Sequence, residues 1–341
     1  MLGVLSLVLI ASQFRADPFR PDYSVFWTAS RIATEDPSKL YETEYVTAAQ
    51  SWLASPAKGP RPWAYPPSAL LIFLPFALLP FWLSYLLWNA ASLVAYLMAC
   101  RRLLSGWRLA ATLISPPVVF ATLSGQTSLL LAAAAISGIA ILGHAPILAG
   151  ILLGGAAAVK PQALILAPIA FVAGRHWRAF GSFICTGAAA LSASLMFGFT
   201  VWIDWFFGLR EFSLIIEELG LHQNGIALRS AAMRLGVGES VMWAIQGAGV
   251  IAGIAFAWWA FRRDGLLERT AGLMGGGLLC SPYAMSYELA ALVPVGLALL
   301  FSNRPWGLVG GLPLTATMGW FTIPALCAAT ILENRDKPST D

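Results

Sequence analysis

The chain has 341 residues, of which 58% are hydrophobic and 11% are charged, and its mean hydropathy is +0.72. Soluble domains are about 45–50% apolar and about 25% charged, so this composition excludes a soluble domain, a disordered chain and a coiled coil. The 21 basic and 17 acidic residues give a net charge of +4, which membrane topology explains without a nucleic-acid partner. The sequence therefore predicts an all-α polytopic membrane protein.

Apolar stretches follow one another along nearly the whole chain, and several are shorter than the roughly 20 residues of a straight span. They occupy residues 2–14, 68–79, 81–99, 109–124, 127–143, 146–159, 162–173, 179–201, 241–261, 270–280, 287–301 and 306–331. Proline and glycine interrupt their ends, which is typical of broken or re-entrant helices. We expect 70–79 to enter the membrane without crossing it. About eleven crossings remain, in a single bundle over residues 1–331 that is followed by a polar tail at 332–341.

Arginine-rich short loops predict the orientation of this bundle. The basic residues of these loops are Arg101, Arg102, Arg108, Arg175, Arg178, Arg262, Arg263, Arg269 and Arg304. If each stretch crosses once, they all fall on one side, and the positive-inside rule makes that side cytoplasmic. Asp264 and Glu268 are the acidic residues expected with them, and the others are expected outside.

The N-terminal stretch Met1–Phe14 has no basic start, which argues against a cleaved signal peptide. As a helix it would reach only about 20 Å. We interpret it as a first transmembrane helix that has been cut short.

Two long outer loops are predicted, at 13–67 and 204–240, and together with short outer turns they carry most of the polar residues. The second loop includes His222, Asn224, Arg229 and Arg234. Ionisable groups at a membrane edge are costly and are functional candidates by default. We therefore expect a cavity that opens to the outside and is lined by the ends of broken helices.

Asp22 is the candidate catalytic residue of the first outer loop. It begins the sequence Asp-Tyr-Ser-Val-Phe-Trp, whose aromatic residues would shelter a carboxylate near the interface. Such a carboxylate can act as a general base toward a hydroxyl group. The alternative is a helix N-cap for residues 23–33, and the two roles are compatible.

Lys160, Arg229 and Gln126 are the candidates for binding an anion. Lys160 follows a Gly/Ala-rich helix, and its compact charge suits a phosphate, but a lone lysine there can also snorkel to water. Arg229 lies about one helical turn from Arg234, so the pair would clamp a phosphate or contact lipid headgroups. Gln126 would contact a ligand or close the backbone at a helix break.

Trp27, Tyr287 and Glu288 are candidates for binding a substrate. The two aromatic residues would form sugar platforms or belong to the interfacial aromatic belt. Glu288 starts an apolar run and would otherwise cap that helix at its positive end.

Metal and thiol chemistry find no support in the sequence. Cys100, Cys185, Cys280 and Cys327 lie at or inside apolar runs without a CxxC pair, which favours inert buried thiols. The three histidines are dispersed, without the spacing of zinc ligands. No cofactor is predicted, and dependence on a divalent metal is left open.

Several short motifs, each of low specificity alone, follow one another along the chain in a particular order. They are Asp22-Tyr-Ser-Val-Phe-Trp-Thr-Ala-Ser-Arg31, Lys39-Leu-Tyr41, Tyr65-Pro66-Pro67, Gly125-Gln126, Lys160-Pro161, Ser281-Pro282-Tyr283 and Tyr287-Glu288. Over about residues 20–300 the chain resembles glycosyltransferase family 87. These are bacterial polyprenyl-phosphate-sugar-dependent, mannosyltransferase-like membrane enzymes with the GT-C fold.

The resemblance implies transfer of a hexose, mannose in the first instance, from a polyprenyl phosphate to a glycolipid or glycan on the outer face of the bacterial plasma membrane. Asp22 matches the expected base, and attack on the anomeric carbon would proceed with inversion. Lys160, Arg229 and Gln126 would hold the donor phosphate, while Trp27, Tyr65, Tyr287 and Glu288 would contact substrate. The absence of a GxGxxG nucleotide fingerprint agrees with a lipid-borne donor.

Two alternatives stand beside this interpretation. A transporter or a flippase of lipid-linked sugars would favour charges near the midplane and inverted repeats, and the sequence shows neither. A catalytically inactive relative is suggested by Ser286, which stands where relatives often have Asp or His, and by the short first helix.

Overall fold

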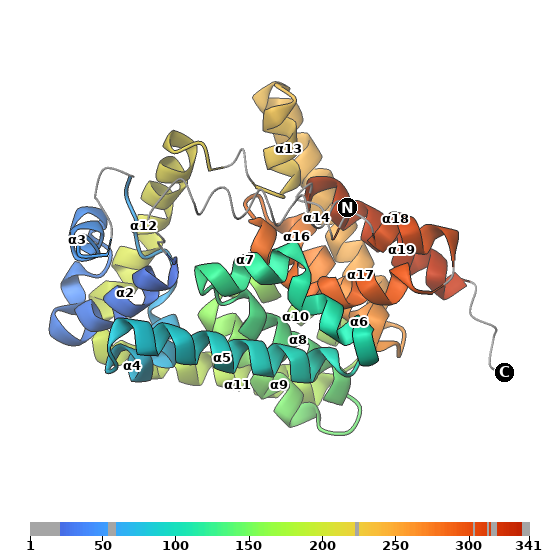
Figure 1. The fold of residues 1–341 in the computed structure, drawn as a ribbon, viewed down its shortest axis with the longest axis horizontal. Coiled ribbons are helices and arrows are strands. Elements are labelled where there is room, and N and C mark those ends of the chain that lie inside the picture. The colour runs from blue at the N-terminus through green and yellow to red at the C-terminus, as the bar shows by residue number, and fades with distance from the viewer. Residues whose placement is uncertain are drawn as a thin grey trace.

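The computed structural model describes residues 21–53, 59–221, 225–302, 304–311, 314 and 319–335. Throughout these ranges the regular secondary structure is helical, which confirms the all-α prediction. Figure 1 shows long and short helices packed side by side, with the blue N-terminal segments at one end and the red C-terminal helices at the other. The predicted first span at 2–14 and most of the tail at 332–341 lie outside the described residues.

The N-terminal part consists of short helices. They are α2 (Tyr23–Glu35), a 3-10 turn (Pro37–Lys39), α3 (Thr43–Ala48), a second 3-10 turn (Pro67–Ala69) and α4 (Leu70–Ala77). The eight residues of α4 extend only about 12 Å, and the helix packs against α2 and the start of α5. This length agrees with a segment that enters a membrane without crossing it.

Three helices in the described part of the chain are long and apolar enough to cross a membrane. They are α5 (Phe81–Cys100), α11 (Trp177–Ser194, continued to Phe197 by a 3-10 turn) and α14 (Glu239–Phe261). Two of them match the stretches predicted at 81–99 and 241–261. The predicted span 179–201 ends early, because Gly198 has a φ of +107° and turns the chain into the next helix.

The remaining apolar stretches form shorter helices, as expected from their proline and glycine residues. They are α6 (Gly106–Ala111), α7 (Pro116–Ser124), α8 (Ser128–Ile141), α9 (Pro146–Val159), α10 (Ala167–Ala173), α15 (Leu266–Thr270), a π-helical turn (Ala271–Gly275), α16 (Gly276–Cys280), a 3-10 segment (Ser286–Ala291), α17 (Val293–Leu300), α18 (Pro305–Gly311) and α19 (Gly319–Arg335).

The segment predicted as the second outer loop, 204–240, is mostly helical. It contains most of α12 (Phe199–Glu218) and α13 (Leu228–Arg234). Apolar residues at positions 199, 203, 206, 207 and 214 recur with helical spacing and are exposed along one side of α12. The charges of α12 hide this period when only the mean hydropathy is considered.

The stretch 306–331 is not the single crossing that its hydropathy predicts. It forms α18 and α19, which pack against each other through Gly310, where an added Cβ would meet the Ala329 side chain. The indole of Trp306 near the start of α18 donates to Glu333 near the end of α19 at 3.0 Å. The chain therefore returns to the end at which it entered.

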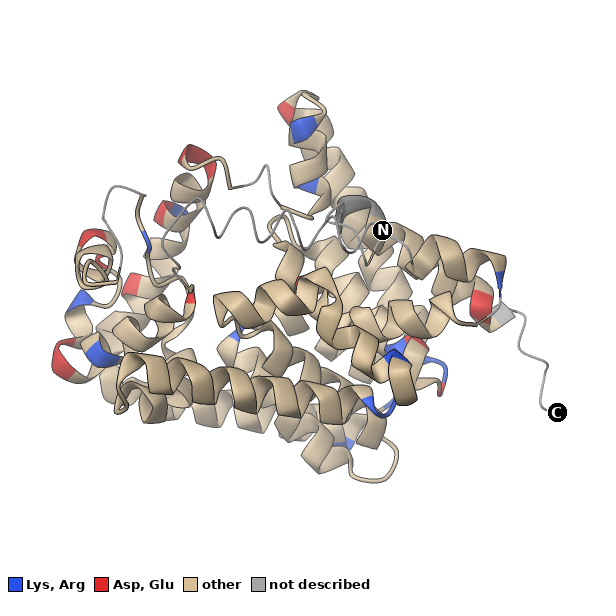
Figure 2. Cartoon of the chain, in the orientation of Figure 1, with Lys and Arg blue, Asp and Glu red and all other residues tan. Residues whose placement is uncertain are grey.

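Basic residues gather at one end of the molecule, where α5, α10, α14 and α17 stop. The Arg108 guanidinium lies 5.3 Å from the ring of Phe301, and Arg263 donates to Asn334 at 2.9 Å. Figure 2 shows the blue segment where α5 ends and the uncharged length of the helix before it. Glu333 belongs to this end too, so its predicted placement on the opposite side is wrong.

Helices α9 and α11 form a close pair that fixes the far end of α9. A Cβ added at Gly150 would overlap Ser182 and the carbonyl of Ala179, and one at Gly154 would lie 2.7 Å from the carbonyl of Phe183. Only glycine allows backbones to approach this closely. Lys160 directly follows α9, so the packing of α9 against α11 also helps to place Lys160.

Candidate functional site

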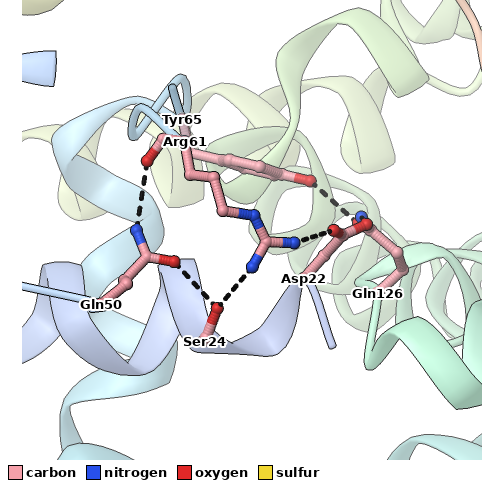
Figure 3. Close-up of polar contacts among 6 residues, drawn as sticks. All are labelled: Asp22, Ser24, Gln50, Arg61, Tyr65 and Gln126. Atoms are coloured by element: carbon pink, nitrogen blue, oxygen red, sulfur yellow. Dashed lines mark hydrogen bonds and ion pairs between the residues drawn. The ribbon is translucent and has the colours of Figure 1, made fainter. Parts of the chain in front are cut away.

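Asp22 directly precedes α2, but its carboxylate does not cap that helix. One oxygen accepts a hydrogen bond from Arg61 at 3.0 Å, and the other accepts one from the Gln126 amide at 2.7 Å. Figure 3 shows both groups converging on the carboxylate from different segments of the chain. The side chain still keeps 40% of its surface exposed. The N-cap interpretation is therefore wrong, and the carboxylate is held toward other parts of the molecule.

The environment of Asp22 makes its carboxylate a stronger base than usual. Burial raises its pKa above the ordinary value for an aspartate, and the Arg61 charge and the Gln126 hydrogen bond partly counteract this rise. A carboxylate with a raised pKa takes up a proton more readily, as general-base catalysis near neutral pH requires.

Arg61 was missed by the sequence analysis, although it is the cation closest to Asp22 in the described residues. Its backbone N–H donates to Thr47 at 2.9 Å, and its carbonyl accepts from Gln50 at 3.2 Å. Its guanidinium also donates to Ser24 at 3.1 Å, and Ser24 donates to Gln50 at 2.8 Å. Figure 3 shows the ring that these contacts form. No residue spacing in 13–67 indicates a contact that joins positions 39 residues apart.

Tyr65 and Gln126 connect Asp22 to a second group of charged residues. The Tyr65 hydroxyl lies 3.5 Å from both Gln126 and Thr127, and burial raises its pKa, so it remains a proton donor. Gln126 directly follows Gly125, which ends α7 with a φ of +67° and lies against Tyr23. A left-handed turn of this kind is the usual role of glycine at a helix end.

Lys160 and Glu288 form an ion pair in which only 11% and 16% of the side chains are exposed. The Lys160 nitrogen also lies 5.9 Å from the ring centres of both Tyr65 and Tyr287. Lys160 therefore does not snorkel to water. The other oxygen of Glu288 accepts from the backbone of Met285 at 3.3 Å, so this residue also caps its 3-10 segment.

A small pocket adjoins this ion pair. Its lining includes Ser128, Lys160, Gln162, Ser281 and Glu288, together with apolar residues of α8 and α16. Ser128 is buried, and its hydroxyl has no hydrogen-bond partner among the described residues. Buried polar groups are normally satisfied, so this hydroxyl is suited to a polar group of a ligand.

Trp27 and Arg229 are occupied elsewhere. The Trp27 indole donates to the carbonyl of Leu79 at 3.0 Å and packs against Phe81. Arg229 donates to Glu217 at 2.7 Å and lies 5.1 Å from the Trp243 ring. The structure thus brings together six of the predicted residues and leaves these two apart. The six are Asp22, Tyr65, Gln126, Lys160, Tyr287 and Glu288.

The other predicted ligands add nothing to this site. His222 and Asn224 lie outside the described residues. Within the ranges that the structure describes, no group of three or more His, Cys, Asp or Glu side chains could hold a metal ion. All four cysteines are free, but Cys185 is exposed on α11 rather than buried.

Comparison with known proteins places these residues in a family. The model of glycosyltransferase family 87 matches residues 63–282. The chain belongs to glycosyltransferase family 87. The resemblance seen in the sequence is therefore confirmed. The matched range includes Tyr65, Gln126 and Lys160 but not Asp22 or Glu288, whose place in the site comes from the geometry.

One characterised relative is a polyprenol-phosphate-mannose-dependent alpha-(1-2)-phosphatidylinositol pentamannoside mannosyltransferase of Mycobacterium tuberculosis (strain CDC 1551 / Oshkosh). The two sequences are 28% identical over 298 residues, which are 80% of this chain. The chain spans only 65% of that relative's length. No solved structure matches.

Proposed function

We propose that this member of family 87 is a membrane glycosyltransferase that moves a hexose from a polyprenyl phosphate to a hydroxyl of a glycolipid or glycan. Mannose is the sugar suggested by the relative's printed name. The observation that carries the proposal is the network from Asp22 through Gln126 and Tyr65 to Lys160. It joins a basic carboxylate to a buried cation, the two charges that a transfer from a sugar phosphate uses.

In the proposed reaction, Asp22 accepts the proton of the acceptor hydroxyl. The acceptor oxygen then attacks the anomeric carbon from the face opposite the phosphate, and a new C–O bond forms. The bond between that carbon and the phosphate oxygen breaks, its electron pair stays on the phosphate, and the anomeric configuration inverts. The phosphate changes from a diester with one negative charge to a monoester with up to two.

Lys160 is the proposed partner of this growing negative charge. A fixed cation in a water-poor site stabilises a charge that develops in the transition state. Glu288 neutralises Lys160 in the absence of substrate, and in the reaction the donor phosphate would share that cation. Glu288 and Tyr287 would then face the sugar, and the Tyr65 hydroxyl would donate a hydrogen bond to the phosphate. Arg229 and Trp27 are not part of this proposal, since other contacts hold them.

The proposed setting is a GT-C-type bundle in the bacterial plasma membrane. The clustering of the basic helix ends supports a cytoplasmic side there, because arginine-rich short loops remain inside. Asp22 precedes α2, close to the opposite end of α5, where Trp27 packs against Phe81. It would therefore face the exterior, where polyprenyl-phosphate sugars are used. The three long helices α5, α11 and α14 would cross, and shorter segments would complete the bundle.

The test is a transfer assay with the full chain purified in lipid. Polyprenyl-phosphate mannose and other polyprenyl-phosphate sugars are supplied with glycolipid acceptors, and Asp22→Asn is compared with wild type. Removing a general base is expected to lower the rate by about two to four powers of ten. Asp36→Asn is the matched control, because Asp36 is exposed and its contacts to Ser38 tolerate an amide.

The assay separates the rival functions. Equal transfer by wild type and Asp22→Asn would remove Asp22 from the base role. An absence of transfer with every donor, combined with movement of a lipid-linked sugar across liposomes, would replace the proposal with a flippase.

A further inference from the structure

Arg61 carries an inference that rests on the proposed function and deepens it. We propose that Arg61 is a positioning residue, whose guanidinium fixes both the orientation and the charge of the Asp22 carboxylate. It touches no reacting atom in this scheme and acts through Asp22. The family match does not include Arg61, because it begins two residues later, at residue 63.

The geometry shows that Arg61 is held in place from both sides. Its backbone is tied to α3 through Thr47 and Gln50, and its guanidinium is divided between Ser24 and Asp22. Gln50 is buried and also anchors to the carbonyl of Val46 at 3.0 Å. An arginine braced at its backbone and at two nitrogens has little freedom to leave the carboxylate. Its exposed fraction is 20%, so water screens this pair only in part.

The two partners of Asp22 together orient its carboxylate. Arg61 binds Oδ1 and the Gln126 amide binds Oδ2, so the plane of the carboxylate is fixed. The second lone pair on each oxygen remains available to a hydroxyl group, which is the geometry a base requires.

Several other ionisable groups face Asp22, and their net effect is small beside that of Arg61. Lys160 and Glu288 largely cancel each other because they form an ion pair. The neutral phenols that sense the Asp22 charge are Tyr65, Tyr283 and Tyr287. Arg61 is therefore the cation that opposes the effect of burial on the pKa of Asp22.

The sign of the effect follows directly. The base works in its ionised form, and Arg61 lowers the pKa of Asp22, which extends activity to lower pH. Without the guanidinium, that pKa rises further. The loss of activity should then be largest in acid and smallest in alkali, where the carboxylate remains ionised in either protein.

The experiment measures kcat/KM against pH for wild type, Arg61→Gln and Arg61→Lys. We expect the acidic limb of Arg61→Gln to move upward by about one pH unit, with about a tenfold loss of kcat/KM at pH values below the limb. Arg61→Lys should restore most of the profile because it keeps the charge. Arg31→Gln is the matched control, since Arg31 is exposed on α2 and pairs only with Glu35 at 3.7 Å among the ion pairs described.

A uniform loss at all pH values with an unmoved limb would overturn the proposal and leave Arg61 a purely structural role. So would an Arg61→Lys profile that matches Arg61→Gln. A second readout needs no turnover: labelling of Asp22 by a carbodiimide, which reacts with protonated carboxyls, is followed by mass spectrometry. Its midpoint should rise in Arg61→Gln. If neither the wild type nor any variant transfers sugar, the proposed function fails. The pH midpoint of Asp22 labelling then still decides the role of Arg61.

Discussion

Two ion pairs stand at the two ends of the candidate site, and they differ in how much of each is open. In the first, Arg61 and Asp22 keep 20% and 40% of their side-chain surface exposed. In the second, Lys160 and Glu288 keep 11% and 16%. A partly exposed carboxylate can be reached by another molecule while it keeps its partner, whereas the charges of a buried pair must always be compensated. The open carboxylate is thus suited to meet an incoming hydroxyl, and the enclosed cation is suited to a phosphate that displaces water.

The pairs also differ in what surrounds them. Neutral hydrogen-bonding groups complete the first, namely Ser24 and Gln126. The rings of Tyr65 and Tyr287 flank the cation of the second. Aromatic faces stabilise a cation without supplying a negative charge, so Lys160 keeps its charge for a ligand. This contrast predicts that damage to the second pair affects both stability and transfer, and that damage to the first affects mainly transfer.

The largest combined effect is expected from Lys160→Met. Removing one member of a buried pair leaves an uncompensated carboxylate and lowers the free energy of unfolding by about 3–5 kcal/mol. Loss of the cation should also lower the rate of transfer by about a hundredfold to a thousandfold. Denaturant titration in detergent and the transfer assay measure the two effects.

The double variant Lys160→Met with Glu288→Gln separates them. It should regain most of the stability, because no charge is left unpaired, and should not regain activity. Recovery of transfer in the double variant would show that Lys160 has only a structural role.

Gln126→Ala is expected to have an intermediate effect. It removes the hydrogen bond to Asp22 Oδ2 and leaves Arg61 in place, so the carboxylate gains freedom to rotate. A lost hydrogen bond to a charged group of about 1.5 kcal/mol corresponds to a roughly tenfold slower transfer. Single-turnover rates at saturating donor measure this loss, and an unchanged rate would remove Gln126 from the site.

Trp27→Phe should have the smallest effect. The phenyl ring keeps the contact with Phe81 and loses only the hydrogen bond to the Leu79 carbonyl. We expect about 1 kcal/mol less stability and unchanged kcat and KM. A marked rise in KM for the donor or acceptor would instead return Trp27 to the substrate site.

Much of this site was predictable because an ionisable residue at the end of an apolar stretch is conspicuous. Lys160 and Glu288 stand out in this way, Asp22 stands out as an acid beside aromatic residues in the first predicted outer loop, and the helix breaks at Gly125 and Pro161 are visible in the sequence. The helical fold was predictable because apolar stretches follow one another along nearly the whole chain. The roles of these residues came from the resemblance to a family, since spacing alone left each with an alternative structural role, such as capping a helix.

The rest depended on contacts that hydropathy does not encode. Arg61 lies in a polar segment without periodicity, and its partners Ser24 and Asp22 are far away along the chain. The α18–α19 pair has the composition of one span, and only packing at Gly310 shows that the chain turns back. In α12 the charges lower the mean hydropathy of a segment that is nonetheless a regular helix of 20 residues.

A double-mutant cycle on transfer tests most directly whether Asp22 and Lys160 act on one substrate molecule. The rates of wild type, Asp22→Asn, Lys160→Met and the double variant are compared with the same donor and acceptor. Residues that act as a unit give strongly non-additive losses, so the double variant should be about as slow as the slower single variant. If the two losses instead multiply, the carboxylate and the cation work independently, and the proposal of a single shared site is contradicted.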